Sequence, residues 1–398
     1  MDIFLLSREL GDERAATNLR LGYTTKLMHS IQSTSNITFS EKHPMGVNAL
    51  DIERQSSKFL LSAGADASIS LWDLDSTPDR ELGFEPTEFV PSPKSHKYAI
   101  SSISFYPADH GLFITSSFDK TVKAWDTNAM EYVTEFNLEE IVYSAVMASK
   151  SFHTMVAVSS QFPAVRLLDL NTGGNIHSLV GHIGAGTLGI NWSPRDEYIL
   201  ASGGVDGTVR LWDIRRAASC LACLDRTNSN SHKFDVKNLA HDGPVNGVSW
   251  SEDGAQLVTL GHDDTMRVWS MSTGENIMTK FEAPIRNRCN QTVNPILTPL
   301  QISDPQLVFT PSNSSILGFN LNKGTLVKRL KVPRASTINA LVQRPGHPDI
   351  YSATTEGKII AWVPETPSNQ ENAAVANEKQ NPLDSIYHSL TRTPMTFT

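Results

Sequence analysis

The sequence predicts an all-β fold made of seven similar four-stranded sheets arranged in a closed ring. One reason is a short segment that recurs seven times in one register, as ISLWDLD, VKAWDTN, VRLLDLN, VRLWDIR, MRVWSMS, ILGFNLN and IIAWVPE. Its central positions lie 43 to 57 residues apart and are Trp72, Trp125, Leu168, Trp212, Trp269, Phe319 and Trp362. The other reason is a content of 24 Gly and 21 Pro, which favours many turns over long helices. Repeats of this length are typical of a seven-bladed β-propeller.

Polar residues recur at fixed distances from four of the tryptophans. An aspartate stands six residues before each one, a histidine stands 28 to 30 residues before it, and a serine or threonine lies between them. In this pattern the chain resembles the WD-repeat family, in which such residues form a buried hydrogen-bonded chain. An unpaired buried polar group costs about 1 to 3 kcal/mol, whereas a satisfied network fixes one geometry. The resemblance implies four structural tetrads: His43, Ser62, Asp66 and Trp72; His96, Ser117, Asp119 and Trp125; His182, Ser202, Asp206 and Trp212; and His241, Thr259, Asp263 and Trp269.

The repeat also predicts how the ring closes. After Trp362 the chain runs into PETPSNQ and lacks the residues for a fourth strand. Upstream of the first blade, the segment 36–40 (NITFS) alternates in polarity, so we expect it to supply that strand and remove two open sheet edges. The predicted organisation is an N-terminal helix-loop-helix extension over 1–32, the propeller over 33–365 and a disordered tail over 366–398.

Charge and cysteine content restrict the classes of function. The net charge of −8 argues against non-specific attraction to nucleic acid or membranes, and we expect no direct sequence-specific nucleic-acid binding. Three cysteines are too few for a disulfide framework, which indicates a reducing compartment, cytosol or nucleus. The N-terminal segment has no signal-peptide pattern, and no run of about 18 to 20 apolar residues suggests a membrane span.

Apparent catalytic and ligand motifs have better structural explanations. The segment GAGTLG at 184–189 leads into a strand rather than a helix, so it is a propeller loop and not a dinucleotide-binding turn. Cys220 and Cys223 have no second pair to complete a zinc site, and Cys289 stands alone. A His and Asp arrangement that recurs in four blades is structural, because catalytic sites are seldom built four times. We therefore predict no enzyme activity and no catalytic, cofactor or metal site.

Two features are not needed by a propeller. In the first ten residues, Ile3, Leu6 and Leu10 share one helical face with Phe4 and Leu5 beside it, and 17–31 offers a second helix. Such an apolar face needs a partner or packs under the ring, and we favour a partner. The other feature is Arg215, followed by Arg216, because WDIR alone among the seven segments has an arginine two residues after the WD aspartate. Its planar cation suits a partner carboxylate or carbonyl on the lower rim, although a plain surface arginine is the alternative.

Together these features resemble those of WD-repeat substrate receptors of cullin-4 ubiquitin ligases. Those proteins carry W-D-x-R, and some also dock on the β-propeller adaptor of the ligase through an N-terminal helix-loop-helix. The resemblance implies adaptor binding by Phe4, Leu5, Leu6, Leu10, Arg215 and Arg216. It further implies a nuclear protein in transcription-coupled nucleotide excision repair, with stalled RNA polymerase II and its repair-coupling remodeller as partners. A scaffold or chromatin-binding module without a ligase link is the competing hypothesis.

Substrate contacts are expected on the upper face, where the two longest spacings place insertions at 76–95 and 225–240. Long connections often carry function. The aromatic and basic residues in or beside these insertions suit protein recognition, and they are Phe84, Phe89, Lys94, Lys97, Lys233, Phe234 and Lys237. A separate basic stretch over 323–334 has two interpretations, a solvated outer strand or a contact with an anionic partner, and we favour the first.

Overall fold

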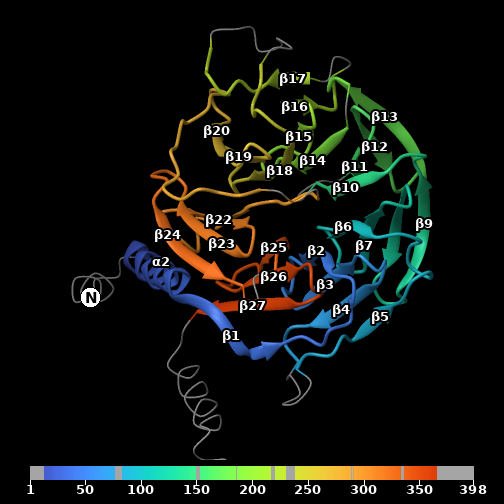
Figure 1. Ribbon diagram of the computed structural model, residues 1–398, viewed down its shortest axis with the longest axis horizontal. Helices are drawn as coiled ribbons and strands as arrows, with labels where there is room; N and C mark the ends of the chain where they lie inside the picture. Colours follow the sequence, from blue (N-terminus) through green and yellow to red (C-terminus); the bar gives the residue numbers. More distant parts are fainter. Residues whose placement is uncertain are drawn as a thin grey trace, which may run out of the picture.

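The protein is a ring of seven antiparallel sheets around one axis (Figure 1). The structure, a computed structural model, describes residues 13–76, 83–148, 153–184, 186–216, 220–229, 238–287, 289, 291–332 and 336–364. The predicted all-β, seven-bladed fold is confirmed. The expected first helix within 1–12 and the expected tail over 366–398 lie outside the described residues.

The strands of each blade are given from the inner to the outer one, which is also their order in the chain except for β1, the outer strand of blade seven. Blades one to three are β2 (Val47–Ile52), β3 (Phe59–Gly64), β4 (Ile69–Asp73), β5 (Glu88–Val90); β6 (Ile100–Phe105), β7 (Leu112–Ser117), β8 (Thr121–Asp126), β9 (Glu131–Asn137); and β10 (Val142–Met147), β11 (Met155–Ser160), β12 (Ala164–Asp169), β13 (Gly174–Val180). Blades four and five are β14 (Thr187–Trp192), β15 (Ile199–Gly204), β16 (Val209–Asp213), β17 (Cys220–Cys223); and β18 (Val245–Trp250), β19 (Gln256–Gly261), β20 (Met266–Ser270). Blades six and seven are β21 (Ile296–Leu297), β22 (Leu307–Ser312), β23 (Ser315–Asn320), β24 (Leu326–Lys331); and β25 (Ile338–Gln343), β26 (Ile350–Thr354), β27 (Ile359–Pro364), β1 (Ile31–Thr38). The helix α2 (Glu13–Ser30) precedes β1.

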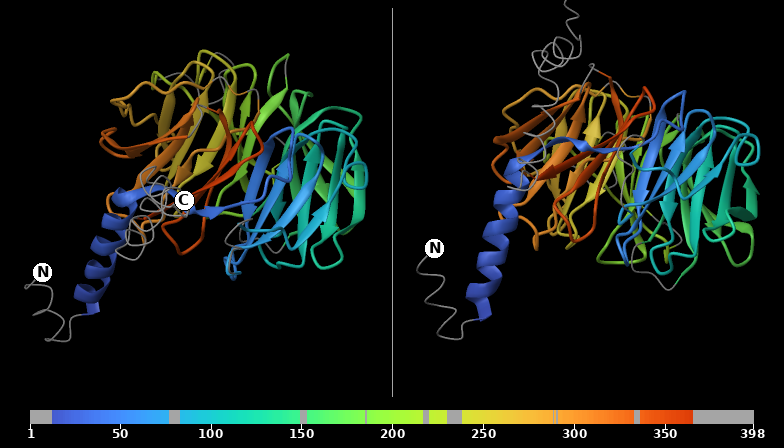
Figure 2. Two further views of the ribbon diagram at one scale, coloured as in Figure 1. Left: turned by 60° about the horizontal axis from the view of Figure 1, so that its bottom comes forward. Right: turned by 90° about the horizontal axis from the view of Figure 1, so that it is seen from below.

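The two faces of the ring follow from the antiparallel order of the strands. We call upper the face with the loops that lead from one blade into the next and the turns between second and third strands. The lower face has the turns between first and second and between third and fourth strands. Because β1 is the fourth strand of blade seven, the end of α2 that joins it lies on the lower face. Figure 2 shows α2 projecting away from the ring on that side.

The core lies between neighbouring blades, where both faces of each sheet are covered. The repeated third-strand positions are buried, including Trp72, Trp212 and Trp269, which have no exposed surface. Leu168 and Phe319 occupy the same position in blades three and six and are also buried. Each large side chain buried in this way stabilises the fold by about 1.5 to 3 kcal/mol.

The ring closes where β1 pairs with β27. Ile31 opposes Pro364 and Ser33 opposes Trp362, after which the register shifts before Thr38. The strand therefore begins five residues before the expected segment 36–40, which was placed too late. The reason is Phe39, which leaves the ladder and packs against Trp72 with ring centroids 5.3 Å apart. The helix over 17–31 likewise differs in its bounds, since α2 begins at Glu13 and ends at Ser30.

Four hydrogen-bonded chains cross the blades, and blade four shows their arrangement. The Trp212 indole N–H donates to Ser202 Oγ at 2.8 Å, and that hydroxyl lies 2.7 Å from His182 Nε2. On the other side of the imidazole, His182 Nδ1 lies 3.2 Å from Asp206 Oδ1. Since the serine oxygen accepts from tryptophan, its own proton is free for Nε2, and Nδ1–H then donates to the carboxylate. Each donor in this chain has an acceptor.

The other blades repeat the chain with two differences. In blade two, Thr115 rather than Ser117 bridges tryptophan and histidine, at 2.8 and 2.7 Å, because the bridge stands ten residues before the tryptophan in every tetrad. Assigning Ser117 to the tetrad was therefore wrong, and its hydroxyl instead bonds the carbonyls of Tyr98 and Ala99. In blade one, Asp66 is 3.5 Å from His43, and Ser68 bonds both side chains. The residues brought together are His43, Ser62, Asp66, Trp72; His96, Thr115, Asp119, Trp125; His182, Ser202, Asp206, Trp212; and His241, Thr259, Asp263, Trp269.

The tetrads shift the pKa values of their members. Burial lowers the pKa of His182 and His241, although each donates to an aspartate. Partial burial pushes the pKa of Asp206 and Asp263 upward, but hydrogen bonds from the histidines outweigh it and hold both carboxyls well below their usual value. At neutral pH, His182 and His241 are therefore neutral, and Asp206 and Asp263 are charged.

Replacing Ile31 by alanine tests the closure. Ile31 is fully buried between α2, Phe309 and Trp362, so we expect the substitution to lower the free energy of unfolding by about 2 to 5 kcal/mol. The nearby Ser33 is exposed on the same strand, and Ser33→Ala should change the free energy by less than about 0.5 kcal/mol. Urea unfolding measures both, and equal effects would contradict the closure through β1.

Thr115→Val tests the corrected tetrad. The change keeps the shape but leaves the Trp125 N–H and His96 Nε2 without their shared partner, so we expect a loss of about 1 to 3 kcal/mol in unfolding free energy. Thr134→Val, on the outer strand β9 of the same blade, is the matched control and should be nearly neutral. If the two variants have the same melting temperature, the Thr115 bridge does not contribute to the stability of the fold.

The pKa shifts predict a loss of stability in acid. Below about pH 6.5, histidines of the unfolded chain take up protons that His182 and His241 do not, so stability falls as pH falls, by up to about 1.4 kcal/mol per histidine and pH unit. Near and below about pH 4 the aspartates add to the loss. Urea unfolding between about pH 7.5 and 5 measures the slope, and His182→Gln should flatten it. A stability that is constant or rises toward pH 5 would refute the shifts.

Candidate functional site

Arg215 lies on the lower face, directly after β16, and its guanidinium has a fixed orientation. Two of its nitrogens donate to the two carboxylate oxygens of Asp213, each at 2.9 Å. The guanidinium carbon lies 4.7 Å from the ring centroid of Tyr198, and one nitrogen is 3.8 Å from Asp196. Hydrogen bonds from Arg215 hold the pKa of Asp213 below its usual value. The arginine is thus an ordered, exposed cation whose fork is already engaged within the chain.

The surface around Arg215 is a groove between blades four and five. Arg216 is exposed beside it, 3.7 Å from Asp213. The groove has a volume of about 840 Å³ and is lined by Tyr198, Trp250 and Ile277 among others. It combines aromatic and cationic groups, which is the composition of many protein-binding surfaces.

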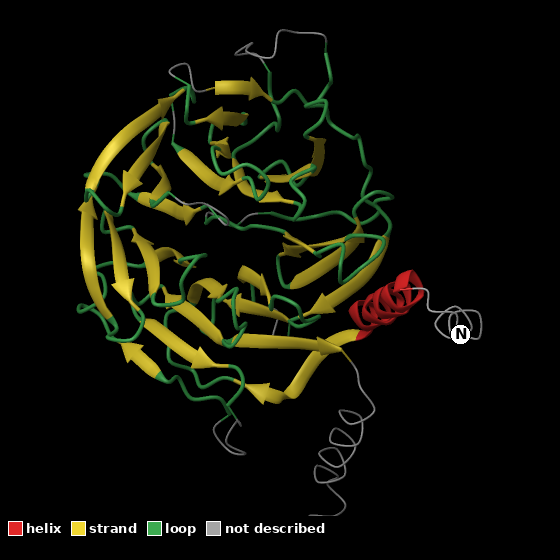
Figure 3. Cartoon of the chain, turned by 180° about the vertical axis from the view of Figure 1, so that it is seen from behind, coloured by secondary structure: helices red, strands yellow, loops and turns green. Residues whose placement is uncertain are grey.

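The helix α2 meets the ring at blades six and seven (Figure 3). Met28 is fully buried against the same cluster as Ile31, and the Thr25 hydroxyl accepts from the Asp304 N–H at 3.1 Å. Lys328 donates to the His29 carbonyl at 3.2 Å. The C-terminal turns of α2 are therefore fastened to the ring, while Tyr23 is exposed.

The predicted adaptor-binding residues are only partly within the described chain. Arg215 and Arg216 share the lower face with the base of α2, but Figure 1 shows that blade four and α2 lie apart around the ring. The four N-terminal residues of this set lie outside the described residues, namely Phe4, Leu5, Leu6 and Leu10.

Three of the predicted substrate-face residues gather in one groove between blades one and two. Phe89 lies on β5, and Lys94 and Lys97 lie in the upper loop that leads into blade two. Tyr132 and Glu135 of β9 form the opposite wall, and the groove has a volume of about 1070 Å³. This part of the insertion forms an aromatic and basic surface, and its contact with a substrate stays a prediction.

Phe84 does not belong to that surface. It lies between the third and fourth strands of blade one, hence on the lower side, and its side chain is only 6% exposed. It stacks on Phe39 with ring centroids 5.3 Å apart and thus completes the core at the ring closure. The assignment of Phe84 to substrate contact was wrong for this reason. Lys233, Phe234 and Lys237 lie outside the described residues.

Sequence reasoning missed a set of exposed apolar side chains on the upper face. Met45 is 69% exposed, Tyr98 is 65% exposed and Ile183 is 56% exposed, although large apolar side chains usually avoid water. Each follows a tetrad histidine by one or two residues, so the available signal was its position after that histidine.

The tetrads hold these loops in place. The free oxygen of the Asp206 carboxylate accepts from the Ile183 N–H at 3.1 Å, and Asp119 accepts from the Lys97 N–H at 3.0 Å. In blade one the corresponding residue is Pro44, which has no N–H to donate. The same interaction that locks a blade therefore positions exposed side chains on the upper face.

The described residues contain no cluster of three or more His, Cys, Asp or Glu that could hold a metal ion. Cys220 and Cys223 are free thiols on β17, and burial raises the pKa of Cys223 to about 12, so it is not a reactive thiolate. None of the described helices has the length and apolarity that crossing a bilayer requires.

This chain is similar to known proteins over much of its length. Residues 34–73, 88–126, 173–213 and 233–270 match the family described as WD domain, G-beta repeat. The WD repeat-containing protein ATCSA-1 of Arabidopsis thaliana is 27% identical over 90% of this chain and 95% of its own length. Radiation-sensitive protein 28 of Saccharomyces cerevisiae is 28% identical over 65% of this chain and 52% of its own length. The chain is thus a seven-bladed propeller, and four of its segments are similar to WD repeats.

Proposed function

We propose that the protein is a substrate-recognition subunit of a cullin-4 type E3 ubiquitin ligase that acts in transcription-coupled nucleotide excision repair. The sequence resembles the Cockayne syndrome group A protein from the N-terminal FLLSREL to the closing IIAWVP. The similarity to ATCSA-1 and to radiation-sensitive protein 28 supports a DNA repair protein of this type. The protein would then work in the nucleus as a binding protein rather than as an enzyme.

The arrangement of the two faces is the observation that carries this proposal. The lower face has the fastened base of α2 and the ordered Arg215, and we assign this face to the β-propeller adaptor of the ligase. The upper face has the exposed side chains of Met45, Tyr98 and Ile183, and we assign it to the substrate. A receptor needs two such opposed surfaces, since it must bind adaptor and substrate at the same time.

The residues that serve each partner follow from this assignment. Phe4, Leu5, Leu6 and Leu10 would enter a cleft of the adaptor, while Arg215 and Arg216 brace its rim. Stalled RNA polymerase II or its repair-coupling remodeller would occupy the upper face and extend into the groove of Phe89 and Lys97. Apolar side chains at the centre with cations beside them are the usual composition of a protein-binding patch.

A scaffold or chromatin-binding module without a ligase is the second candidate. The observation in its favour is that Asp213 already occupies the guanidinium of Arg215. In that case Arg215 orders its own loop and no adaptor is needed. The upper face would bind a partner in either function. The two candidates therefore differ in whether the lower face binds the adaptor.

Paired surface variants separate the two candidates. Leu6→Asp with Arg215→Glu should weaken binding of the purified cullin-4 adaptor by at least about tenfold, which is about 1.4 kcal/mol. Tyr98→Asp with Met45→Asp should leave adaptor binding unchanged and weaken capture of the remodeller. Circular dichroism and thermal melting check that both proteins remain folded. Biolayer interferometry measures both affinities.

The control for charge alone is Lys97→Glu, which reverses one cation on the upper face and should not affect the adaptor. Absence of adaptor binding by the wild-type protein, or full binding by the lower-face variant, would reject the ligase function and favour the scaffold.

A further inference from the structure

Blade five differs from its neighbours at the outer rim. In the described part of the chain, six sheets have four strands, whereas the sheet of blade five ends at β20. The segment after β20 forms a single bridge, between Trp269 and Asn276, flanked by hydrogen bonds from the Ile277 N–H to the Val268 carbonyl at 2.8 Å and from the Ser270 N–H to the Glu275 carbonyl at 2.9 Å. Beyond that point the chain leaves the sheet.

Specific interactions draw the chain away from β20. The Asn276 N–H donates to the Asn228 side-chain oxygen at 2.8 Å, and the Asn276 amide donates to the Arg226 carbonyl at 3.0 Å. Asn228 donates in return to the Asn276 carbonyl at 2.9 Å. Met278 then takes a left-handed conformation with φ of 58°, which a strand does not allow. The opening is therefore fixed by the local sequence.

The backbone of Met266 faces this opening. Gly261 N–H donates to the Thr265 carbonyl, so the residues of β20 that bond to β19 are the odd-numbered ones. The Ser270 N–H bonds outward to Glu275, in agreement with this alternation. The N–H and C=O of Met266 consequently point out of the sheet, where an outer strand would pair with them.

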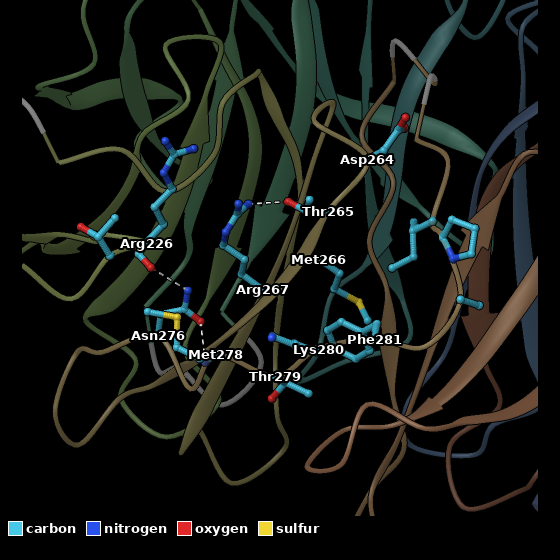
Figure 4. Close-up of a pocket in the computed structure, with 14 residues that line it drawn as sticks. Arg226, Asp264, Thr265, Met266, Arg267, Asn276, Met278, Thr279, Lys280 and Phe281 are labelled. Carbon is cyan, nitrogen blue, oxygen red and sulfur yellow. Dashed lines mark hydrogen bonds between the residues drawn. The ribbon is translucent and has the colours of Figure 1, made fainter.

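A groove of about 640 Å³ occupies the place of the outer strand (Figure 4). Its apolar wall includes Met266, Phe281 and Ile285, and Met278 is 51% exposed beside it. Alternate side chains of an added strand would contact this wall. The groove therefore offers both a backbone edge and an apolar surface.

Cations surround the groove. Arg226 forms an ion pair with Asp242, and Arg267 is 2.9 Å from Asp263. Lys280 is exposed, and within the described residues no carboxylate lies at salt-bridge distance from it. The Glu282 N–H donates to the Gly324 carbonyl at 3.0 Å, which places the turn with Lys323 next to Lys280. Asp264 also lines the groove, and Arg226 and Arg267 are already paired with aspartates, so the cation left for an anionic ligand is Lys280, with Lys323 beside it.

We propose that this groove binds an extended acidic peptide segment of a partner protein, which adds to β20 as the outer strand of blade five. The Met266 backbone supplies the pairing, the apolar wall receives alternate side chains, and Lys280 contacts a carboxylate. Nucleic acid would use the cations but has no peptide groups to pair with Met266. The site is on the rim, separate from both the adaptor and the substrate surfaces proposed above.

The test uses a fluorescein-labelled peptide of sequence EVEIEVE and the full-length protein, with binding followed by fluorescence anisotropy. We expect saturable binding that KVKIKVK does not reproduce and that N-methylation of alternate peptide groups reduces by at least about tenfold. Lys280→Glu should weaken binding by a similar factor. The matched control Lys331→Glu, on the outer strand of blade six, should change it by less than about twofold.

A second pair of variants isolates the backbone. Met266→Pro removes the outward N–H without touching the β19 ladder and should abolish binding, whereas Met266→Ala should weaken it less than about fivefold. Lack of saturation up to about 1 mM, equal binding of the N-methylated peptide, or equal loss with Lys331→Glu would each overturn the proposal.

Discussion

The buried hydroxyl between tryptophan and histidine is the interaction on which the ring depends most. The hydroxyl accepts a hydrogen bond from the indole N–H and donates one to the imidazole. A single oxygen atom therefore joins the third strand to the loop that enters the blade. In blade four the aspartate at the far end, Asp206, binds the histidine with one oxygen and the Ile183 N–H with the other. Blade stability and the shape of the upper face therefore have one physical origin, and a change in either affects both.

At the ring closure, the stability of the fold and the position of α2 on the lower face are linked in a similar way. β1 completes blade seven and removes two open edges, and Ile31 and Met28 bury themselves in the same cluster as Trp362. The helix α2 is consequently continuous with the strand that closes the propeller. The contacts that hold the closing strand therefore also hold the C-terminal turns of α2.

Much of the fold could be predicted from the sequence because the repeat reports buried positions directly. Trp72, Trp125, Trp212 and Trp269 fill equivalent core sites, and the histidines and aspartates follow at set distances. Ser117 was misassigned because several hydroxyl residues lie near the bridging position, although the spacing of ten residues to the tryptophan in the other tetrads selects Thr115. Phe84 could not be placed, because its burial depends on Phe39, which is distant in sequence. The exposed Tyr98 was missed because apolar character alone suggests burial.

Blade five lacks a regular outer strand, and this absence has a different cause from the replacement of the repeat tryptophan in blades three and six. In those blades Leu168 and Phe319 replace tryptophan by another apolar group, and the sheets remain four-stranded. Blade five has a complete tetrad and still lacks a regular outer strand, so core packing is not the cause. Protection of an exposed edge from aggregation does not explain the missing strand either, because a lysine on the edge would be enough for that. The paired amides of Asn228 and Asn276 hold the chain off β20, so the open edge follows from these local hydrogen bonds.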